Sequence, residues 1–159
     1  MKITILCVGK IKEKYFTDAI AEYSKRLSRY CKLEILEAAD EKTPDRAGEA
    51  LERQIKEREA QRVLKYLKED SYVIALAIDG KKFTSEKFAS CIDDLGVKGV
   101  SHITFLIGGS LGMDQSLLDR ADLKLSFSDM TFPHQLMRVI LLEQIYRAYR
   151  IISGEPYHK

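Results

Sequence analysis

Cysteine is scarce in this sequence, and long hydrophobic runs are absent from it. The three cysteines, Cys7, Cys31 and Cys91, are an odd number without close spacing, so neither a disulfide framework nor a zinc site is expected. The longest uninterrupted apolar run extends from Tyr72 to Ile78, which is far too short to cross a bilayer. The amino-terminal MKITILCVGK has no small-residue cleavage site and is typical of a first strand. We therefore expect a cytoplasmic protein with reduced thiols, no metal and no membrane association.

Several well-known catalytic and nucleotide-binding motifs are also missing. The chain has no G-x-G-x-x-G spacing and no Lys-Ser/Thr pair after a glycine loop, so dinucleotide and nucleoside-triphosphate sites are disfavoured. No H-E-x-x-H, Ser-His-Asp or Cys-His pattern is present. A functional site in this chain must therefore be built from other residues.

Charge of one sign is not in large excess, but it is unevenly distributed. Lys and Arg number 26 against 24 Asp and Glu, which gives a net charge of +2. Between Lys10 and Lys32 there are seven basic and three acidic residues, and the carboxyl-terminal part adds Arg138, Arg147, Arg150 and Lys159. Such patches fit either a nucleic-acid footprint or solvated helix faces, and charge alone does not separate the two.

The apolar pattern predicts one α/β domain over residues 1–159. With 45% hydrophobic and 31% charged residues, a chain of 159 residues can bury a core without disulfides or metals. Short apolar runs, typical of strands, alternate with helical patterns, which favours a mainly parallel sheet flanked by helices on both faces. The predicted strands are 3–8, 33–36, 72–78, 103–107 and 123–127, and the predicted helices are 13–30, 44–69, 84–95, 114–120 and 133–152.

The final predicted helix differs from the others in its pattern. Apolar residues cover most of its circumference and leave only a narrow polar sector with Glu143, Arg147 and Arg150. Pro133 stands where a first-turn proline belongs, with Thr131 upstream as a possible cap. A helix that is apolar nearly all round must be buried on several sides. Because its own sheet covers one side, the pattern predicts a twofold homodimer.

The segment LIGGSLGMD, at 106–114, follows the fourth predicted strand. In open parallel sheets, ligands bind beyond the carboxyl ends of strands, and glycines there let the backbone approach a ligand. A plain strand-to-helix turn is an equally good interpretation of this segment.

Two further segments are candidates for a site. Residues 127–134 combine small polar and large apolar side chains, which suits a mixed pocket, although Ser128, Asp129 and Thr131 could instead cap the helix. The carboxyl-terminal GEPYHK exposes aromatic and basic residues after Gly154 and is either a frayed tail or a functional arm.

Taken together, these segments closely resemble a known enzyme family. The strings LIGGSLGMD, LSFSDMTFPHQLMRVILLEQIYRAYRI and GEPYHK, with the opening MKITILCVGK and the internal YVIALAIDGKKFTSEKFA, resemble the SPOUT methyltransferases. The resemblance is to the RlmH family, which N3-methylates a pseudouridine in bacterial 23S ribosomal RNA, and it spans the whole chain.

The resemblance implies a fold and a cofactor site. It implies an α/β sheet whose carboxyl-terminal part is tied in a trefoil knot, which periodicity does not reveal. The knot loops of the family bind S-adenosyl-L-methionine, for which glycine gives close backbone approach and large apolar side chains give walls. The implied cofactor-binding residues are Leu76, Gly108, Phe127, Ser128, Asp129, Met130, Thr131 and Phe132.

The resemblance also places the substrate at the carboxyl terminus. Arg147, Tyr157, His158 and Lys159 are implied in substrate binding or catalysis. The ring nitrogen must lose its imide proton, and His158, bulk water, or a charge-stabilising Arg147 are open alternatives for that step. Tyr157 could stack on a base and Lys159 could contact a phosphate.

Partners and a competing function follow from the same resemblance. The expected partner is the assembled ribosome with its 23S RNA, since the chain has no separate RNA-binding domain. The alternative function is a ribosome-associated RNA-binding factor of the same fold without turnover. A small-molecule nucleotide-binding protein is a third possibility, but it would need a phosphate cradle that the sequence lacks.

Overall fold

The computed structural model describes residues 1–157, and within them strands and helices alternate along the chain. The predicted order of elements is confirmed from the first strand to the last helix. The strands are β1 (Lys2–Val8), β2 (Lys32–Ala38), β3 (Tyr72–Lys82), β4 (His102–Ile107) and β5 (Leu123–Ser126). The helices are α1 (Lys14–Leu27), α2 (Glu49–Leu64), α3 (Ser85–Val97), α4 (Gln115–Arg120) and α5 (His134–Ile152).

The strands form one five-stranded sheet in the order β2-β1-β4-β3-β5, and every neighbouring pair is parallel. The pairing is in step at the carboxyl ends, where Val8 lies beside Ala38 and Cys7 beside Ile107. All strands therefore finish at one edge of the sheet, which is the edge where parallel α/β proteins bind ligands. This confirms the predicted α/β class with a parallel sheet covered on both faces.

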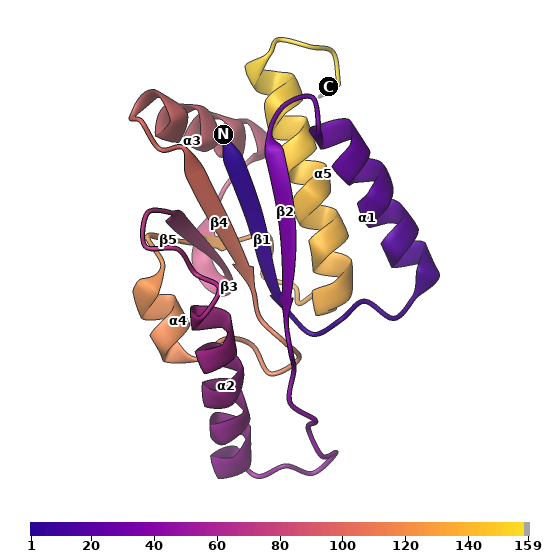
Figure 1. Ribbon diagram of the computed structural model, residues 1–159, viewed down its shortest axis with the longest axis vertical. Helices are drawn as coiled ribbons and strands as arrows, with labels where there is room; N and C mark the ends of the chain where they lie inside the picture. The colour runs from indigo at the N-terminus through magenta and orange to yellow at the C-terminus, as the bar shows by residue number, and fades with distance from the viewer. Residues whose placement is uncertain (158–159) are drawn as a thin grey trace.

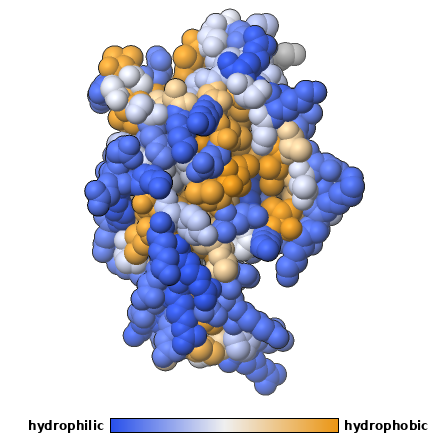
Figure 2. Space-filling view, viewed as in Figure 1, coloured by the Kyte–Doolittle hydropathy of each residue, from blue (hydrophilic) through white to orange (hydrophobic). Residues whose placement is uncertain are grey.

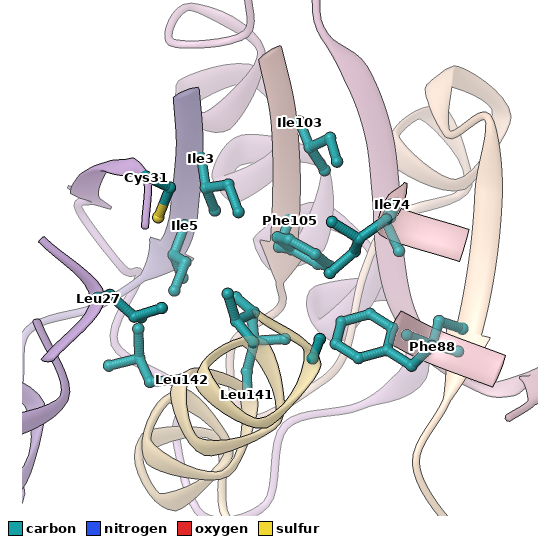
Figure 3. Packing of buried hydrophobic residues seen from close by; sticks show 14 of the residues in the cluster. Ile3, Ile5, Leu27, Cys31, Ile74, Phe88, Ile103, Phe105, Leu141 and Leu142 are labelled. Carbon is teal, nitrogen blue, oxygen red and sulfur yellow. The ribbon is translucent and has the colours of Figure 1, made fainter. Parts of the chain in front are cut away.

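Three helices cover one face of the sheet. Helix α5 lies between α1 and α3, and its Leu141 and Leu142 are fully buried against the strands. Figure 3 shows these leucines pointing toward Ile5 and Phe105 in the centre of this layer. Apolar side chains buried this completely are worth roughly 1.5–3 kcal/mol each, so this layer is the main stabilising core.

Helices α2 and α4 cover the other face (Figure 1). Only part of α2 is buried there, and Figure 2 shows it as a largely hydrophilic arm with hydrophobic residues beside it. Near the amino ends of the strands this face is polar: Thr4 Oγ1 is 2.8 Å from His102 Nε2, and Thr104 donates to the Ser71 hydroxyl at 3.0 Å. These groups are buried but satisfy one another, as buried polar groups must.

The largest boundary differences from the prediction are in α2 and β3. Helix α2 is shorter than the predicted 44–69, because Gly48 has an extended backbone and forms the amino-terminal cap. Strand β3 continues past Ile78 to Lys82, since both Leu76 and Lys81 pair with Leu125 of β5 around an irregularity. The intervening residues thus loop out at the carboxyl end of β5.

The start and the surroundings of α5 also correct the sequence interpretation. Pro133 is the cap residue and not a first-turn residue, and no side chain caps the helix, so neither Thr131 nor its neighbours do so. The apolar circumference is largely explained within the chain, because the sheet, α1 and α3 together surround most of the helix. The apolar pattern of α5 is therefore not sufficient on its own to predict a homodimer.

Candidate cofactor and substrate site

A cavity of about 840 Å³ opens at the carboxyl edge of the sheet. Three segments wall it: the end of β3 from Leu76 to Asp79, the turn from Ile107 to Met113, and the residues from Leu125 into the start of α5. Its volume lies within the usual range for cofactor-sized sites, which is roughly 300–1,000 Å³. The cavity brings together Leu76, Gly108, Phe127, Ser128, Met130, Thr131 and Phe132 of the predicted cofactor residues.

The glycine turn is shaped by close backbone contacts. A β-carbon on Gly108 would lie 2.9 Å from the carbonyl carbon of Gly112 and 2.9 Å from Met113 Cγ. Gly112 has φ of +88°, a left-handed conformation that other residues rarely adopt. Gly109 and Gly112 pair in an isolated bridge. The glycines thus allow the turn to fold back on itself and leave bare backbone along the cavity wall.

The connection from β5 to α5 forms the opposite wall. Phe127 is half-buried and packs against Phe88, with ring centroids 6.5 Å apart. The Ser128 hydroxyl accepts a 3.0 Å hydrogen bond from the Met130 amide, and the Met130 side chain is 74% exposed. This wall therefore combines a packed aromatic ring, Phe127, with the exposed and flexible side chain of Met130.

Asp129 lies apart from the other seven residues. Its side chain is exposed and forms an ion pair with Lys82 at the end of β3, and it does not line the cavity. Asp129 therefore ties the loop to β3 in this structure, and its cofactor-binding role stays a prediction.

The described part of the tail is folded back on α5. The Tyr157 hydroxyl donates to Glu143 Oε2 at 2.7 Å, and the Arg147 guanidinium lies 4.6 Å from the centre of the Tyr157 ring. Arg147 also forms an ion pair with Glu143 at 2.6 Å. Burial and the hydrogen bond to Glu143 raise the pKa of Tyr157 to about 12, so this phenol stays protonated at neutral pH. Arg147 and Tyr157 thus form one cluster. His158 and Lys159 lie outside the described residues.

This cluster is separated from the cavity of its own chain. Helix α5 begins beside the cavity at His134 and runs back along the sheet, so that its carboxyl end lies at the opposite edge (Figure 1). Arg147 follows His134 by thirteen residues, which is about 20 Å along a helix axis at 1.5 Å per residue. Neither Arg147 nor Tyr157 is among the residues that line the cavity.

The structure also places two residues at the site that sequence reasoning did not assign to it. Glu59 of α2 is 6% exposed, and its Oε1 lies 3.2 Å from the position of a β-carbon on Gly109. Burial raises the pKa of Glu59. His134 lines the cavity, and burial together with the nearby Arg138 lowers its pKa, which favours the neutral imidazole. Glu59 stands in a run of charged residues with no local signal, whereas His134 is the last residue of the segment 127–134 that the sequence already singled out.

Residues 1–157 contain neither a candidate metal site nor a membrane-spanning helix. In this part of the chain, no group of three or more His, Cys, Asp or Glu side chains is placed to hold a metal ion. No helix among these residues combines the length and the apolar character needed to cross a membrane. A second cavity of about 840 Å³ lies between the end of α1 and β2, and none of the predicted site residues lines it.

The chain is similar in sequence to curated relatives and in fold to solved structures. A "Ribosomal RNA large subunit methyltransferase H" of Bifidobacterium adolescentis is 67% identical to the chain over 159 residues, and the Clostridium novyi protein of the same name is 64% identical; both alignments cover 100% of each chain. A probable methylase family protein from Haemophilus influenzae has a TM-score of 0.55 at 13% identity, over 99% of this chain and 70% of its own. A Legionella pneumophila structure solved with bound SAM has a TM-score of 0.51 at 11% identity, over 93% of this chain and 66% of its own.

The parallel sheet, with a glycine-walled cavity at its carboxyl edge, defines an α/β protein with a ligand site, and the full-length relatives place it in the methyltransferase class. The family described as "Predicted SPOUT methyltransferase" matches residues 1–158. The chain belongs to the SPOUT methyltransferase family.

Proposed function

We propose that this protein is an S-adenosyl-L-methionine-dependent methyltransferase that modifies N3 of a pseudouridine in 23S ribosomal RNA on the assembled ribosome. The observation that carries the proposal is the cavity at the carboxyl edge, where seven predicted cofactor residues meet a bare glycine backbone. The full-length relatives named for large-subunit ribosomal RNA support the choice of substrate. Because ribosomes work in the cytoplasm, we place the reaction there.

The cavity residues fit S-adenosyl-L-methionine. Leu76, Phe127 and Phe132 offer apolar surfaces for the flat adenine, and the turn at Gly108–Met113 offers main-chain groups for its polar edge. When bound, the cofactor supplies an electrophilic methyl group on a sulfonium. The chain then has to hold the attacking nitrogen in line with that methyl group, and such positioning is worth several kcal/mol of the barrier.

Arg147 and Tyr157 are proposed to act on the RNA. The Arg147 guanidinium can stabilise the negative charge of the deprotonated imide, and the Tyr157 ring can stack on a base. Tyr157 is not the proton acceptor, since its raised pKa keeps the phenol protonated at neutral pH. His158 and Lys159 are proposed to complete this arm as proton acceptor and phosphate contact.

We further propose that the protein is a homodimer whose sites are shared. Leu136, Val139 and Ile140 of α5 are only partly buried and lie outside the core contacts, so they form an apolar stripe beside the cavity. Arg147 and Tyr157 stand at the other end of the same helix. If two copies pack these helices antiparallel about a twofold axis, the tail of each copy reaches the cavity of the other.

The carboxyl-terminal part is also proposed to form the trefoil knot of the family. The residues between Leu76 and Lys81 loop around the end of β5, and a β-carbon on Gly80 would lie 2.7 Å from the backbone of Lys124 and Leu125. The segment leaving β5 lines the same cavity on its way to α5. The knot is tested by an experimental structure whose density is continuous through the loop between Leu76 and Lys81 and through the connection from β5 to α5.

Methylation itself is tested with purified protein, ribosomes and labelled S-adenosyl-L-methionine. We expect one labelled 23S nucleotide, located by mass spectrometry of RNA fragments, and little label on naked RNA. Cofactor binding and ribosome binding without any transfer would instead support the ribosome-associated factor without turnover.

Site sharing is tested by mixing two inactive variants. One carries Thr131→Trp, which fills the cavity from an exposed position, and the other is truncated after Gly154. Random pairing makes about half the dimers mixed, and each mixed dimer has one intact site, so activity should return to roughly a quarter of wild type. A mixture that contains heterodimers by mass spectrometry but stays inactive contradicts sharing.

A further inference from the structure

The loop between β1 and α1 begins beside the cavity. A β-carbon on Gly109, which lines the cavity, would lie 3.2 Å from Val8 Cγ1 at the end of β1. The chain then continues through Gly9, Lys10, Ile11 and Lys12. The loop therefore starts next to the glycine turn that forms one cavity wall.

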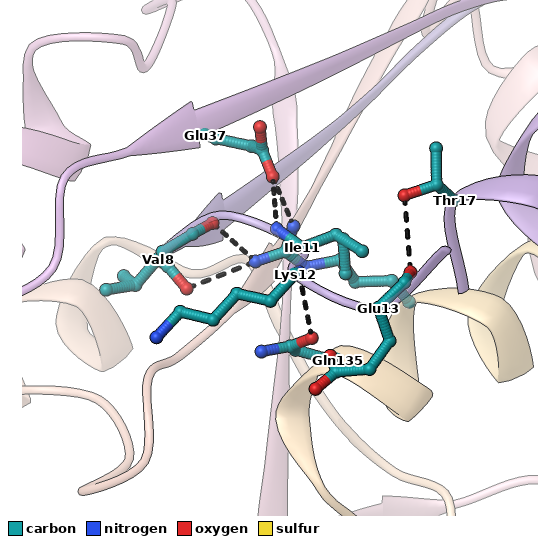
Figure 4. Close-up of polar contacts among 9 residues, drawn as sticks. Val8, Ile11, Lys12, Glu13, Thr17, Glu37 and Gln135 are labelled. Carbon is teal, nitrogen blue, oxygen red and sulfur yellow. Dashed lines mark hydrogen bonds and ion pairs between the residues drawn. The ribbon is translucent and has the colours of Figure 1, made fainter. Parts of the chain in front are cut away.

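The backbone of this loop is fastened by a buried arginine. The Arg138 side chain is 2% exposed, and its guanidinium donates to Gly9 O at 2.6 Å and Val8 O at 3.2 Å while forming a 2.7 Å ion pair with Glu37. Glu37 also accepts from the Ile11 amide at 3.2 Å (Figure 4). The loop is thus tied to β2 and to α5 through its main chain.

A second attachment joins the loop to the first turn of α5. The Lys12 amide donates to Gln135 Oε1 at 3.5 Å. Gln135 directly follows His134, which lines the cavity. All these contacts are made by backbone groups of the loop, and the lysine side chains take no part in them. Figure 4 shows the Lys12 side chain extending away from all the dashed contacts.

The amino groups of this loop are not neutralised by the described residues. Lys10 and Lys12 are exposed, and neither takes part in an ion pair within residues 1–157, whereas the following Lys14 is paired with Asp18. The Glu37 carboxylate is already paired with Arg138. Two exposed lysines therefore extend from a fastened loop that begins beside the cavity.

We propose that Lys10 and Lys12 contact phosphates of the RNA whose base enters the cavity. The inference rests on the proposed function and adds a second RNA contact, separate from the carboxyl-terminal arm. Lysine is suited to this role as a point charge for phosphate, and a loop ordered before binding loses little entropy when the RNA docks. The contact is sequence-independent and orients the RNA backbone along the cavity rim.

The experiment compares Lys10→Gln/Lys12→Gln with Lys65→Gln/Lys68→Gln in the full-length protein. The control pair removes the same charge from exposed lysines that follow α2, near the amino end of β3. Ribosome binding is measured by co-sedimentation over a salt series, and methylation over a series of ribosome concentrations. Affinity of each variant for S-adenosyl-L-methionine is measured by calorimetry.

We expect the loop variant to bind ribosomes about tenfold more weakly at moderate salt, with the control pair close to wild type. Loss of two phosphate contacts should also reduce the slope of log affinity against log salt by about 1.4–1.8. An unchanged slope and affinity would overturn the phosphate contact. A fall in cofactor affinity would instead assign the lysines to the cofactor carboxylate. If the wild-type protein binds ribosomes but transfers no methyl group, the proposed function fails while the salt comparison still decides this inference.

Discussion

The backbone of Gly112 lies so close to Gly108 in the turn at the cavity that Gly108 has no room for a side chain. A β-carbon on Gly108 would be 2.9 Å from the Gly112 carbonyl carbon, a distance that real β-carbons do not show. Gly108 is thus needed for the turn to fold. Its effect on a ligand in the cavity is indirect, because it acts through the shape of the turn.

Substitution of Gly108 should therefore damage cofactor binding even when the new side chain is small. We expect Gly108→Ala to shift the turn and to weaken S-adenosyl-L-methionine binding by at least about tenfold, since displacements near 1 Å at a site can cost ~100-fold in rate. The matched control is Gly48→Ala, where the added β-carbon meets nothing within 4 Å. Calorimetry on both variants is the measurement. Equal affinities would show that the turn does not touch the cofactor.

Removal of the Arg138 guanidinium should destabilise the protein strongly. Arg138→Met takes the side-chain donor from the Val8 and Gly9 carbonyls and the ion-pair partner from the half-buried Glu37; acceptors left without a donor cost roughly 1–3 kcal/mol each, which gives a loss of about 3 kcal/mol. For a chain of this size that lowers the melting temperature by about 6–12 °C.

The control for this prediction is Arg62→Met, which breaks a more exposed pair with Glu41. Such pairs contribute about 0–1 kcal/mol. Thermal unfolding of both variants by circular dichroism tests the difference, and similar melting temperatures would contradict the role assigned to Arg138.

His102 should make stability depend on pH. Burial first, and then the nearby Lys2, lower its pKa below the ordinary 6.5, so the folded state holds the neutral ring. Its contribution is present in full above pH 6.5 and is lost as the pH falls below that value, because the unfolded chain takes up the proton first. One such group changes the free energy of unfolding by up to about 1.4 kcal/mol per pH unit.

The measurement is urea unfolding of the wild type and of His102→Gln between pH 7.5 and 5. Glutamine can keep a hydrogen bond to Thr4 but does not titrate. We expect the wild type to lose more stability across this range than the variant. Parallel curves would mean that His102 has the same proton affinity in both states.

The order of elements could be predicted because every buried strand is a short apolar run between charged or glycine-containing segments. Boundaries failed where tertiary pairing overrides local signals. Asp79 and Gly80 look like the end of a strand, yet Lys81 and Lys82 pair with β5 beyond them. Gly80 lies close to the backbone of β5, and the residues next to Gly80 in the sequence give no indication of this contact.

The cavity wall was predicted from the resemblance, residue by residue, and the structure gathers seven of those eight residues. Asp129 departs because its charge finds Lys82, a partner that no local pattern indicates. Glu59 was missed because a buried carboxylate in a charged helix looks like its exposed neighbours. The apolar pattern of α5 indicates that the helix is buried on most sides. It does not identify what covers the helix, which can be α1, α3 or a second copy of the chain.

The cavity described above is lined entirely by residues beyond Ala75, from Leu76 to Met137. Residues 1–75 thus build β1, α1, β2 and α2, and none of them lines the cavity. A chain still being synthesised has no pocket until β5 and α5 have docked onto strands made much earlier. Cofactor binding therefore requires that β5 and α5 are in place, so binding is a test of whether the chain has folded completely.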